Sequence, residues 1–129
     1  MIALDTNVIV RYLVRDDPDQ TSRAEAIIDQ LSDETPGFVA TIVWAEVYWV
    51  LTRGYSLGRT EVVENLAALY IADEIRTENS AAMRSAITHA RQGADFADAL
   101  INATATSAGC TEVVTFDKRA ADKLGWRLI

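Results

Sequence analysis

The stretch Met1-Ile-Ala-Leu-Asp-Thr-Asn-Val-Ile-Val10 decides the fold, because it joins a short apolar strand, a polar turn and the start of a helix. The apolar run Ile2 to Leu4 is typical of a parallel strand that is buried on both faces. From Val8 onward apolar residues recur at helical spacing, so a helix follows after a very tight turn. Asp5 is therefore expected at the carboxyl end of a buried strand, where open α/β sheets bind their ligands.

Composition indicates one compact domain over residues 1–129, since half of the 129 residues are hydrophobic and little chain is left for a second core. The single cysteine, Cys110, excludes an internal disulfide. No charged leader or long apolar segment predicts secretion or a membrane span, and a bacterial-type cytoplasm fits best. Nineteen acids against twelve bases give a formal charge of −7, which argues against a general basic surface for nucleic acid. A phosphate-containing substrate would need local positive charge or metal ions.

Strand and helix signals alternate along the chain, without a linker or a repeat. Asp16-Asp17-Pro18 ends the first helix and starts a second, and Pro36-Gly37 ends the second. Further helices are expected over 42–51, 58–71, 95–108 and 120–124. Another helix is expected to begin at a cap formed by Asn79 or Ser80 and to end at Gly93. Strands are expected at 38–40, near Ile75, at 113–116 and at 126–129. This alternation predicts parallel crossovers and a three-layer α/β/α sandwich with a central parallel sheet.

Four acidic residues lie in sequence surroundings that are otherwise apolar, where a charged side chain is energetically unfavourable. Glu46 is the only charge in the helix 42–51, and Asp98 lies among apolar residues of the helix 95–108. Asp5 and Asp117 each end an apolar strand, and they lie about 5 Å apart if those strands are neighbours. No lysine or arginine lies inside these segments, so the expected counter-charge is a hard divalent cation, Mg²⁺ or Mn²⁺.

Residues beside these acids are candidates for supporting roles. Asp95 shares a helical face with Asp98 and is expected to be an accessory ligand. Thr115 lies on the same side of its strand as Asp117, so its hydroxyl can orient the group. Thr6 and Asn7 follow Asp5 directly and are assigned the same orienting role.

Each acid also has a purely structural alternative. Asp5, Thr6, Asn7, Asp95 and Asp117 are residue types that cap helices. Asp98 could instead pair with an arginine, and Glu46 could lie on a narrow solvent-facing stripe. The coincidence of two acids at strand ends and two in apolar helices favours a shared ligand.

Four segments together resemble a PIN domain and, more narrowly, a VapC-type toxin: Met1-Ile-Ala-Leu-Asp-Thr-Asn-Val8, the lone Glu46, Asp95-Phe-Ala-Asp-Ala-Leu100 and Thr115-Phe-Asp-Lys118. The resemblance spans essentially the whole chain, in the order and spacing of the family. The resemblance implies that the four catalytic, metal-binding acids of the family correspond to Asp5, Glu46, Asp98 and Asp117. Asp95 is then an accessory metal ligand. The resemblance also implies a Mg²⁺- or Mn²⁺-dependent ribonuclease and a VapB-type antitoxin encoded beside it.

This chemistry suits phosphodiester hydrolysis. Carboxylate-held metal can polarise the phosphodiester, lower the pKa of a water and stabilise the leaving oxygen, which leaves a 5′-phosphate and a 3′-hydroxyl. The competing route through the ribose 2′-hydroxyl commonly uses two histidines, whereas this chain has only His89, interpreted as structural. Arginines and a lysine near the acids are the candidate RNA-backbone contacts, and a solvated surface explains most of them equally well: Arg11, Arg15, Arg53, Arg59, Lys118 and Arg119.

Two other classes stay open. A phospho-receiver domain has a similar length and a Mg²⁺-binding acid cluster. Its acceptor aspartate ends a central strand, whereas Glu46 and Asp98 of this chain fall inside predicted helices. A catalytically silent module that only binds an antitoxin is the second alternative. The sequence does not identify the RNA that is cut.

Two assemblies are expected. Trp44, Tyr48, Trp49 and Tyr55 are more aromatic residues than one small core needs, which predicts a homodimer, as the resemblance also suggests. Ordinary packing of these residues in the core is the alternative. The antitoxin is expected to lie along apolar grooves beside the first helices and to insert an arginine or lysine among the four acids. The acidic surface would speed capture of such a basic segment.

Overall fold

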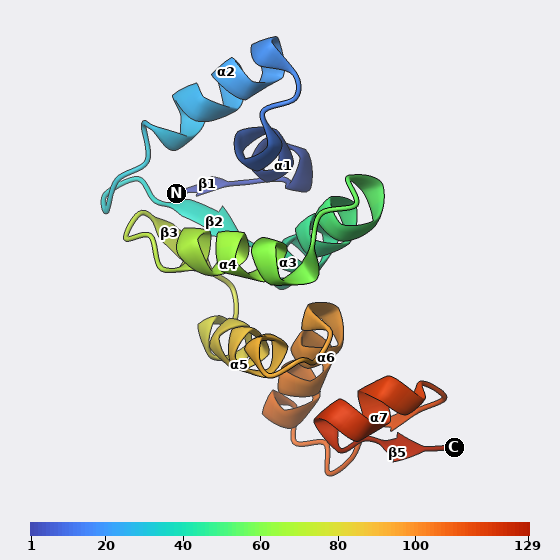
Figure 1. Cartoon of the computed structure of the whole chain (residues 1–129). Coiled ribbons are helices and arrows are strands. Elements are labelled where there is room, and N and C mark those ends of the chain that lie inside the picture. Colours follow the sequence, from blue (N-terminus) through green and yellow to red (C-terminus); the bar gives the residue numbers. More distant parts are fainter. The chain divides into compact units, whose positions relative to one another are not determined.

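The computed structural model describes all 129 residues. They form two compact units, Met1–Glu78 and Asn79–Ile129, which are described in turn. Figure 1 labels most of their elements. All strand pairs in both units are parallel, which confirms the parallel α/β class expected from the alternation of strands and helices.

The sheet of the first unit has three short parallel strands in the order β1 (Ile2–Ala3), β2 (Gly37–Val39) and β3 (Ile75–Thr77). Their bounds lie within one or two residues of the expected strands. Gly37 permits the close packing at the start of β2, because a Cβ there would lie 2.8 Å from Leu31 Cδ1 and 3.1 Å from Leu4 Cδ1. A larger residue at this position would make the Leu31 side chain shift.

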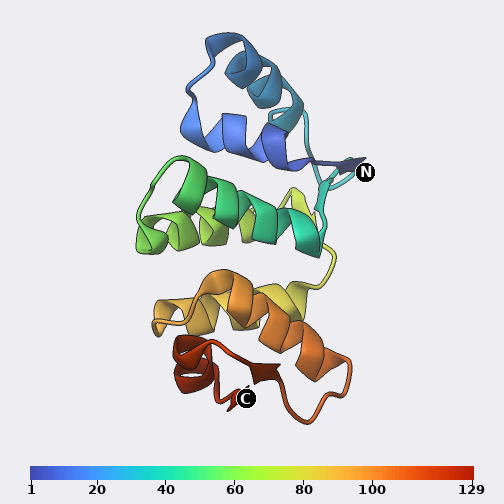
Figure 2. The ribbon, with the colours of Figure 1, turned by 90° about the vertical axis from the view of Figure 1, so that its right-hand side faces the viewer.

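Helices of the first unit connect these strands. They are α1 (Thr6–Val14), α2 (Pro18–Ile28), α3 (Thr41–Trp49), the π-helical turn η1 (Val50–Gly54) and α4 (Arg59–Tyr70). The side chain of Asp17 caps α2 by accepting a 3.0 Å hydrogen bond from the Gln20 amide, as the Asp-Asp-Pro signal predicts. Within this unit α1 packs on α2 and α3, and α3 packs on α4 (Figure 2).

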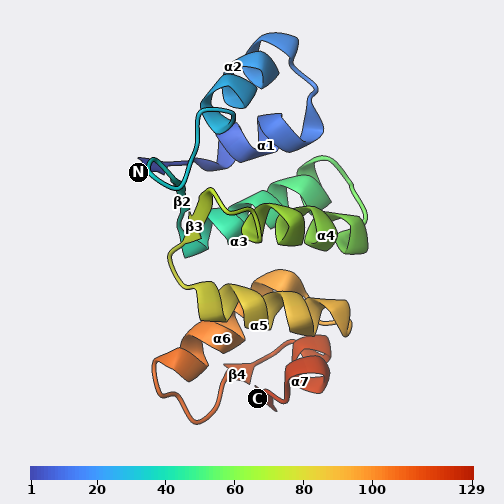
Figure 3. The ribbon, with the colours of Figure 1, turned by 90° about the vertical axis from the view of Figure 1, so that its left-hand side faces the viewer.

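The second unit begins with α5 (Ser80–Arg91) and α6 (Phe96–Ser107), which pack closely on each other (Figure 3). The strands β4 (Val114–Thr115) and β5 (Arg127–Leu128) pair in parallel around α7 (Lys118–Leu124). Gly93 and Gly125 follow α5 and α7 with φ of 103° and 69°, a conformation that favours glycine. The predicted helix end at Gly93 is thus confirmed.

Burial differs from the expectation in three apolar segments. Ile2 and Ala3 are exposed rather than buried on both faces, and only Leu4 of the expected apolar run is buried. The expected buried strand 113–116 leaves Val114 and Phe116 exposed. In α3, Trp44 is buried, but Ile42 and Trp49 are 68% and 50% exposed, so this helix is not buried all round. Separately, none of the helices has the length and apolarity needed to cross a bilayer.

Candidate functional site

Asp5 stands between β1 and α1, as the sequence predicts. Its backbone carbonyl accepts the first bonds of α1, from the amides of Val8 at 3.1 Å and Ile9 at 3.3 Å. Its exposed carboxylate, in contrast, makes no capping hydrogen bond. Capping therefore does not account for this carboxylate, whose oxygens are open to a ligand.

Thr6 connects this strand end to α3. Thr6 is buried, and its hydroxyl donates a short hydrogen bond to Oε2 of Glu46. Because Thr6 follows Asp5 directly, the bond ties the Glu46 carboxylate to the segment that carries Asp5. The structure thus joins two residues of the predicted site that are forty positions apart in the sequence.

Glu46 lies on the uncovered side of α3. The expectation of a charge inside a buried helix is wrong, because Glu46 is exposed and shares its side of the helix with exposed Ile42 and Trp49. The solvent-facing alternative describes this residue correctly. The sequence analysis also missed Glu78, whose Oε2 accepts a 2.7 Å hydrogen bond from the Thr41 amide at the start of α3.

Asp95 and Asp98 lie together at the start of α6 in the second unit. Oδ1 of Asp95 accepts a 3.1 Å hydrogen bond from the Asp98 amide, so Asp95 is the expected helix cap. Both residues are half-buried, and their neighbours Phe96 and Ala99 are buried. The two acids therefore share one turn of α6, as their spacing predicts.

Asp117 caps α7. Its Oδ1 accepts hydrogen bonds from the amides of Arg119 at 2.8 Å and Ala120 at 3.1 Å. The Asp117 amide in turn donates a 2.9 Å bond to the Thr115 hydroxyl. Thr115 thus contacts the backbone of Asp117, its role in orienting the carboxylate stays a prediction, and the capping alternative is correct for Asp117.

The prediction that all four carboxylates lie in apolar surroundings that disfavour a charge is wrong. Asp5, Glu46 and Asp117 are exposed and Asp98 is half-buried. β1 and β4 belong to different units, so the predicted closeness of Asp5 and Asp117 stays a prediction.

The donor atoms nevertheless fit a hard divalent cation. The Asp5 carboxylate is uncapped, Asp117 uses only Oδ1 as a cap, and Glu46 is held by a hydroxyl through Oε2. All these donors are carboxylate oxygens, which Mg²⁺ and Mn²⁺ prefer. Neither unit by itself brings three or more Asp, Glu, His or Cys side chains close enough to hold a metal.

Arg11 is anchored within the first unit. It donates hydrogen bonds to the Tyr55 hydroxyl at 2.7 Å and Asp16 at 3.0 Å, and Tyr55 donates to Asp16 at 2.9 Å. The Tyr55 hydroxyl, more than the Asp16 charge, raises the pKa of Arg11. The bond from Tyr55, with the nearby Arg11 charge, lowers the pKa of Asp16. This arginine is thus a fixed part of the fold rather than a free surface cation.

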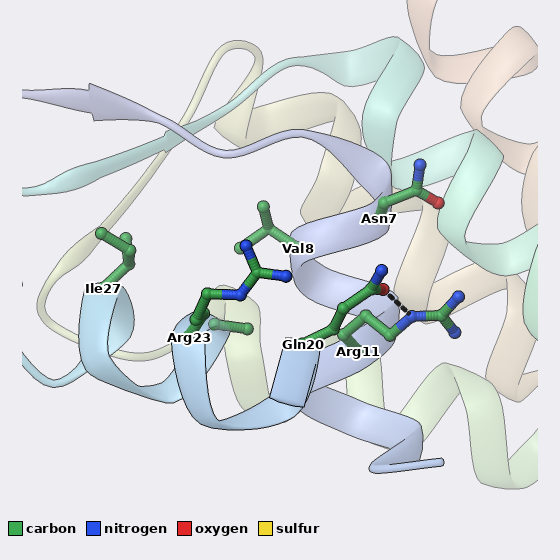
Figure 4. A pocket seen from close by; sticks show the side chains of 7 residues that line it. Asn7, Val8, Arg11, Gln20, Arg23 and Ile27 are labelled. Atoms are coloured by element: carbon green, nitrogen blue, oxygen red, sulfur yellow. Dashed lines mark hydrogen bonds between the residues drawn. The ribbon is translucent and has the colours of Figure 1, made fainter. Parts of the chain in front are cut away.

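A pocket of about 440 Å³ opens between α1 and α2 (Figure 4). This pocket lies beside the first helices, but its lining mixes polar and apolar side chains, so an apolar groove for an antitoxin stays a prediction. The sequence analysis missed the roles of Gln20 and Arg23, although both lie on the helical face that also carries Ala24 and Ile27. The lining residues are Asn7, Val8, Arg11, Gln20, Arg23, Ala24 and Ile27.

The other predicted RNA contacts are surface residues. Arg15 forms an ion pair with Glu25, and its guanidinium lies 5.6 Å from the centre of the Tyr12 ring. Lys118 and Arg119 are exposed in the first turn of α7. His89 is half-buried, and its Nδ1 lies 2.9 Å from the Ser85 carbonyl of its own helix, which fits a structural role.

The PIN domain family matches residues 2–125, nearly the whole chain and both units. The chain belongs to the PIN domain family. This membership confirms the predicted α/β/α sandwich class with its central parallel sheet, and it separates the chain from phospho-receiver domains. PIN domains are a family of metal-dependent nucleases. Membership therefore supports the predicted class of enzyme, a hydrolase. Among curated proteins, none matches this PIN domain.

Proposed function

We propose that this PIN domain is a Mg²⁺- or Mn²⁺-dependent endoribonuclease that acts with both units as a single domain. The metal ligands are Asp5, Glu46, Asp98 and Asp117, with Asp95 accessory. The observation that carries this proposal is the uncapped Asp5 carboxylate beside Thr6, whose hydroxyl holds Glu46. A carboxylate that neither caps a helix nor fills the core is available for a ligand.

Residues of the chain orient this chemistry. Thr6 fixes Oε2 of Glu46, and Asp95 fixes the turn of α6 that carries Asp98. Thr115 holds the backbone of Asp117. A bound divalent ion supplies Lewis-acid polarisation of the phosphodiester and lowers the pKa of a water molecule. Hydrolysis by water leaves a 5′-phosphate and a 3′-hydroxyl on RNA.

We also propose that the protein is the toxin of a toxin–antitoxin pair. The exposed acids, in a chain with a formal charge of −7, favour a basic partner segment. A VapB-type antitoxin that inserts an arginine among the acids would form bidentate bonds to carboxylates. Replacing that arginine by alanine should restore cleavage while the complex persists; unchanged inhibition after every basic residue is replaced would contradict this mode of inhibition.

A homodimer completes the proposal. Trp44 and Tyr48 are core residues, and Tyr55 is bound to Arg11, so the predicted aromatic cluster leaves only Trp49 largely exposed. The Arg53 guanidinium lies 4.0 Å from the centre of the Trp49 ring. Aromatic residues and arginine are enriched in protein interfaces. We place the protein in the cytoplasm, a compartment in which the exposed Cys110 stays reduced.

Metal-dependent cleavage of RNA tests this function. Purified protein with Mg²⁺ or Mn²⁺ should cut RNA and leave 5′-phosphate ends, and excess chelator should abolish the cut. The same ions should raise the melting temperature, because they bind the folded state only. Sequencing the new 5′ ends in cells that express the protein identifies the RNA. Full activity in chelator would contradict the mechanism, and no cleavage of any RNA would favour the silent binding module.

A further inference from the structure

The α1–α2 pocket has a polar side that suits a nucleotide. Four of its lining residues are polar, namely Asn7, Arg11, Gln20 and Arg23, and none is acidic. In a chain with a formal charge of −7, the lining of this pocket holds two arginines and no acid, although each arginine pairs with an aspartate outside the lining, Arg11 with Asp16 and Arg23 with Asp19. Arginine binds phosphate through a planar fork of N–H donors.

The two arginines differ in how firmly they are held. Arg11 is fixed by Asp16, Tyr55 and Gln20, so its guanidinium presents a rigid plane at the pocket. Arg23 pairs only with Asp19, at 2.8 Å, and both side chains of this pair are more than 70% exposed. Such an exposed pair contributes little to stability, so Arg23 can exchange Asp19 for a phosphate at small cost.

The carboxamide of Gln20 has a defined orientation. Its Oε1 accepts a 2.5 Å hydrogen bond from Nε of Arg11, the bond drawn in Figure 4. The oxygen is therefore occupied, and the NH₂ group remains as a donor toward a ligand. A donor in this position recognises an acceptor atom on the edge of a base, such as a carbonyl oxygen or a ring nitrogen.

The apolar side of the pocket suits the face of a base. Val8 of α1 and Ala24 and Ile27 of α2 line it, and Figure 4 shows side chains of the two helices around one opening. Its volume of about 440 Å³ lies in the range of small-molecule sites. Aliphatic side chains and a guanidinium plane are surfaces on which an unstacked base can lie.

The pocket also lies close in sequence to the proposed metal ligands. Asn7, at its edge, is two residues after Asp5, in the first turn of α1. We propose that this pocket binds one unstacked ribonucleotide of the substrate, next to the phosphodiester that is cut. Arg23 holds its phosphate, the base lies against Val8, Ala24 and Ile27, and the amides of Asn7 and Gln20 bond its edge. The proposal rests on the ribonuclease function and names the part of the RNA that the protein selects.

Titration of the full chain with the four ribonucleoside 5′-monophosphates, in chelator, tests binding without cleavage. NMR should show saturable shifts of the side-chain amides of Asn7 and Gln20 for at least one monophosphate. Ribose 5-phosphate, which lacks the base, should bind about tenfold more weakly, because it loses the base contacts. Equal binding of ribose 5-phosphate, or no shift at these amides, would overturn the proposal.

Two variants and a matched control locate the site. Gln20→Glu keeps the shape and the contact with Arg11 but removes the NH₂ donor, and Arg23→Ala removes the phosphate contact; each should weaken binding about tenfold. Arg84→Ala, which removes an exposed helix arginine of α5, should leave binding unchanged. Equal weakening by all three variants would show a general charge effect and overturn the proposal. Binding of an apolar peptide that no monophosphate displaces would do the same.

Cleavage assays separate this proposal from the nuclease function itself. If Gln20→Glu cuts the same sites with the same KM as wild type, the pocket assignment is wrong and the function stands. If monophosphates bind here but no RNA is cut with any metal, the pocket stands and the nuclease function is wrong. A changed nucleotide preference in Gln20→Glu, with cleavage still dependent on metal, supports both.

Discussion

The hydroxyl of Thr6 donates a hydrogen bond to Oε2 of Glu46, which connects the residue after Asp5 to the middle of α3. Thr6 is 6% exposed, whereas Glu46 is exposed, so the buried partner fixes the position of the exposed one. An exposed glutamate otherwise samples many rotamers, and holding it costs conformational entropy. The bond therefore orients a proposed metal ligand in advance.

Thr6→Val should uncouple Glu46 from the Asp5 segment. We expect RNA cleavage to fall about tenfold, and urea denaturation to show a loss of about 1 kcal/mol, the usual contribution of one hydrogen bond. Thr52→Val is the matched control, because the Thr52 hydroxyl bonds only the Tyr48 carbonyl four residues before it, at the end of α3, at 2.7 Å. An equal fall in cleavage for both variants would mean that Thr6 acts through stability alone.

Alanine at Asp5 and at Asp117 should affect stability differently. Asp117→Ala removes a side-chain cap with two hydrogen bonds, so it should lower the free energy of unfolding by about 1 kcal/mol. Asp5→Ala removes no capping bond and should change it by less than about 0.5 kcal/mol. Urea denaturation in chelator measures both. A larger loss at Asp5 than at Asp117 would contradict the assignment of the caps.

The Asp16 carboxylate should make stability depend on pH. Its pKa lies below the usual 3.8 in the folded protein, chiefly through the Tyr55 hydroxyl and also through Arg11. A lowered pKa means that its stabilisation is present above pH 3.8 and is lost as the pH falls through the folded-state pKa. Asp16→Asn should therefore lower the melting temperature at pH 7, and the difference from wild type should shrink toward pH 2. Asp122→Asn controls for removal of one surface charge, and a difference that stays constant with pH would contradict this account.

Trp49 should contribute to the homodimer. Light scattering at micromolar concentration should give twice the mass of one chain for the wild type, and Trp49→Ala should shift the protein toward one chain, since interface aromatics contribute strongly to association. Ile71→Ala is the control, because Ile71 is 74% exposed and also lies on the first unit. A wild-type mass of one chain would contradict the dimer.

The elements of the fold could be predicted from local signals. Pro18, Asn79 and Gly93 mark helix ends by their own backbone and side-chain chemistry, so the start of α2 and the bounds of α5 follow from the sequence. The expected end of the second helix at Pro36-Gly37 is wrong, because α2 already ends at Ile28. Burial could not be predicted in the same way. A helix as apolar as α3 does not reveal which side stays uncovered, and Glu46 was wrongly expected inside the core.

The candidate site could be predicted only in part. The acids stand out by residue type and position, but the Thr115–Asp117 contact does not follow from the two-residue period of a strand, because it joins the Thr115 hydroxyl to the Asp117 backbone amide just after β4. The Thr6–Glu46 bond and the pocket depend on how α1 packs against α3 and α2, which no spacing within one segment reveals. Gln20 was missed for this reason, since its partner Arg11 lies on α1. Arg23 was missed because the pocket that it lines forms only where α1 packs on α2.

A double-mutant cycle of cleavage rates for Asp5→Asn, Asp98→Asn and the double variant tests the central claim, that acids of both units serve one metal-dependent reaction. Single-turnover rates on one RNA with saturating Mg²⁺ should fall more than about a hundredfold for each single variant, and the double variant should be no slower than the worse single one. Asp122→Asn, an exposed acid of α7, should cut at the wild-type rate. Normal cleavage by both single variants, or losses that simply multiply in the double variant, would contradict the account.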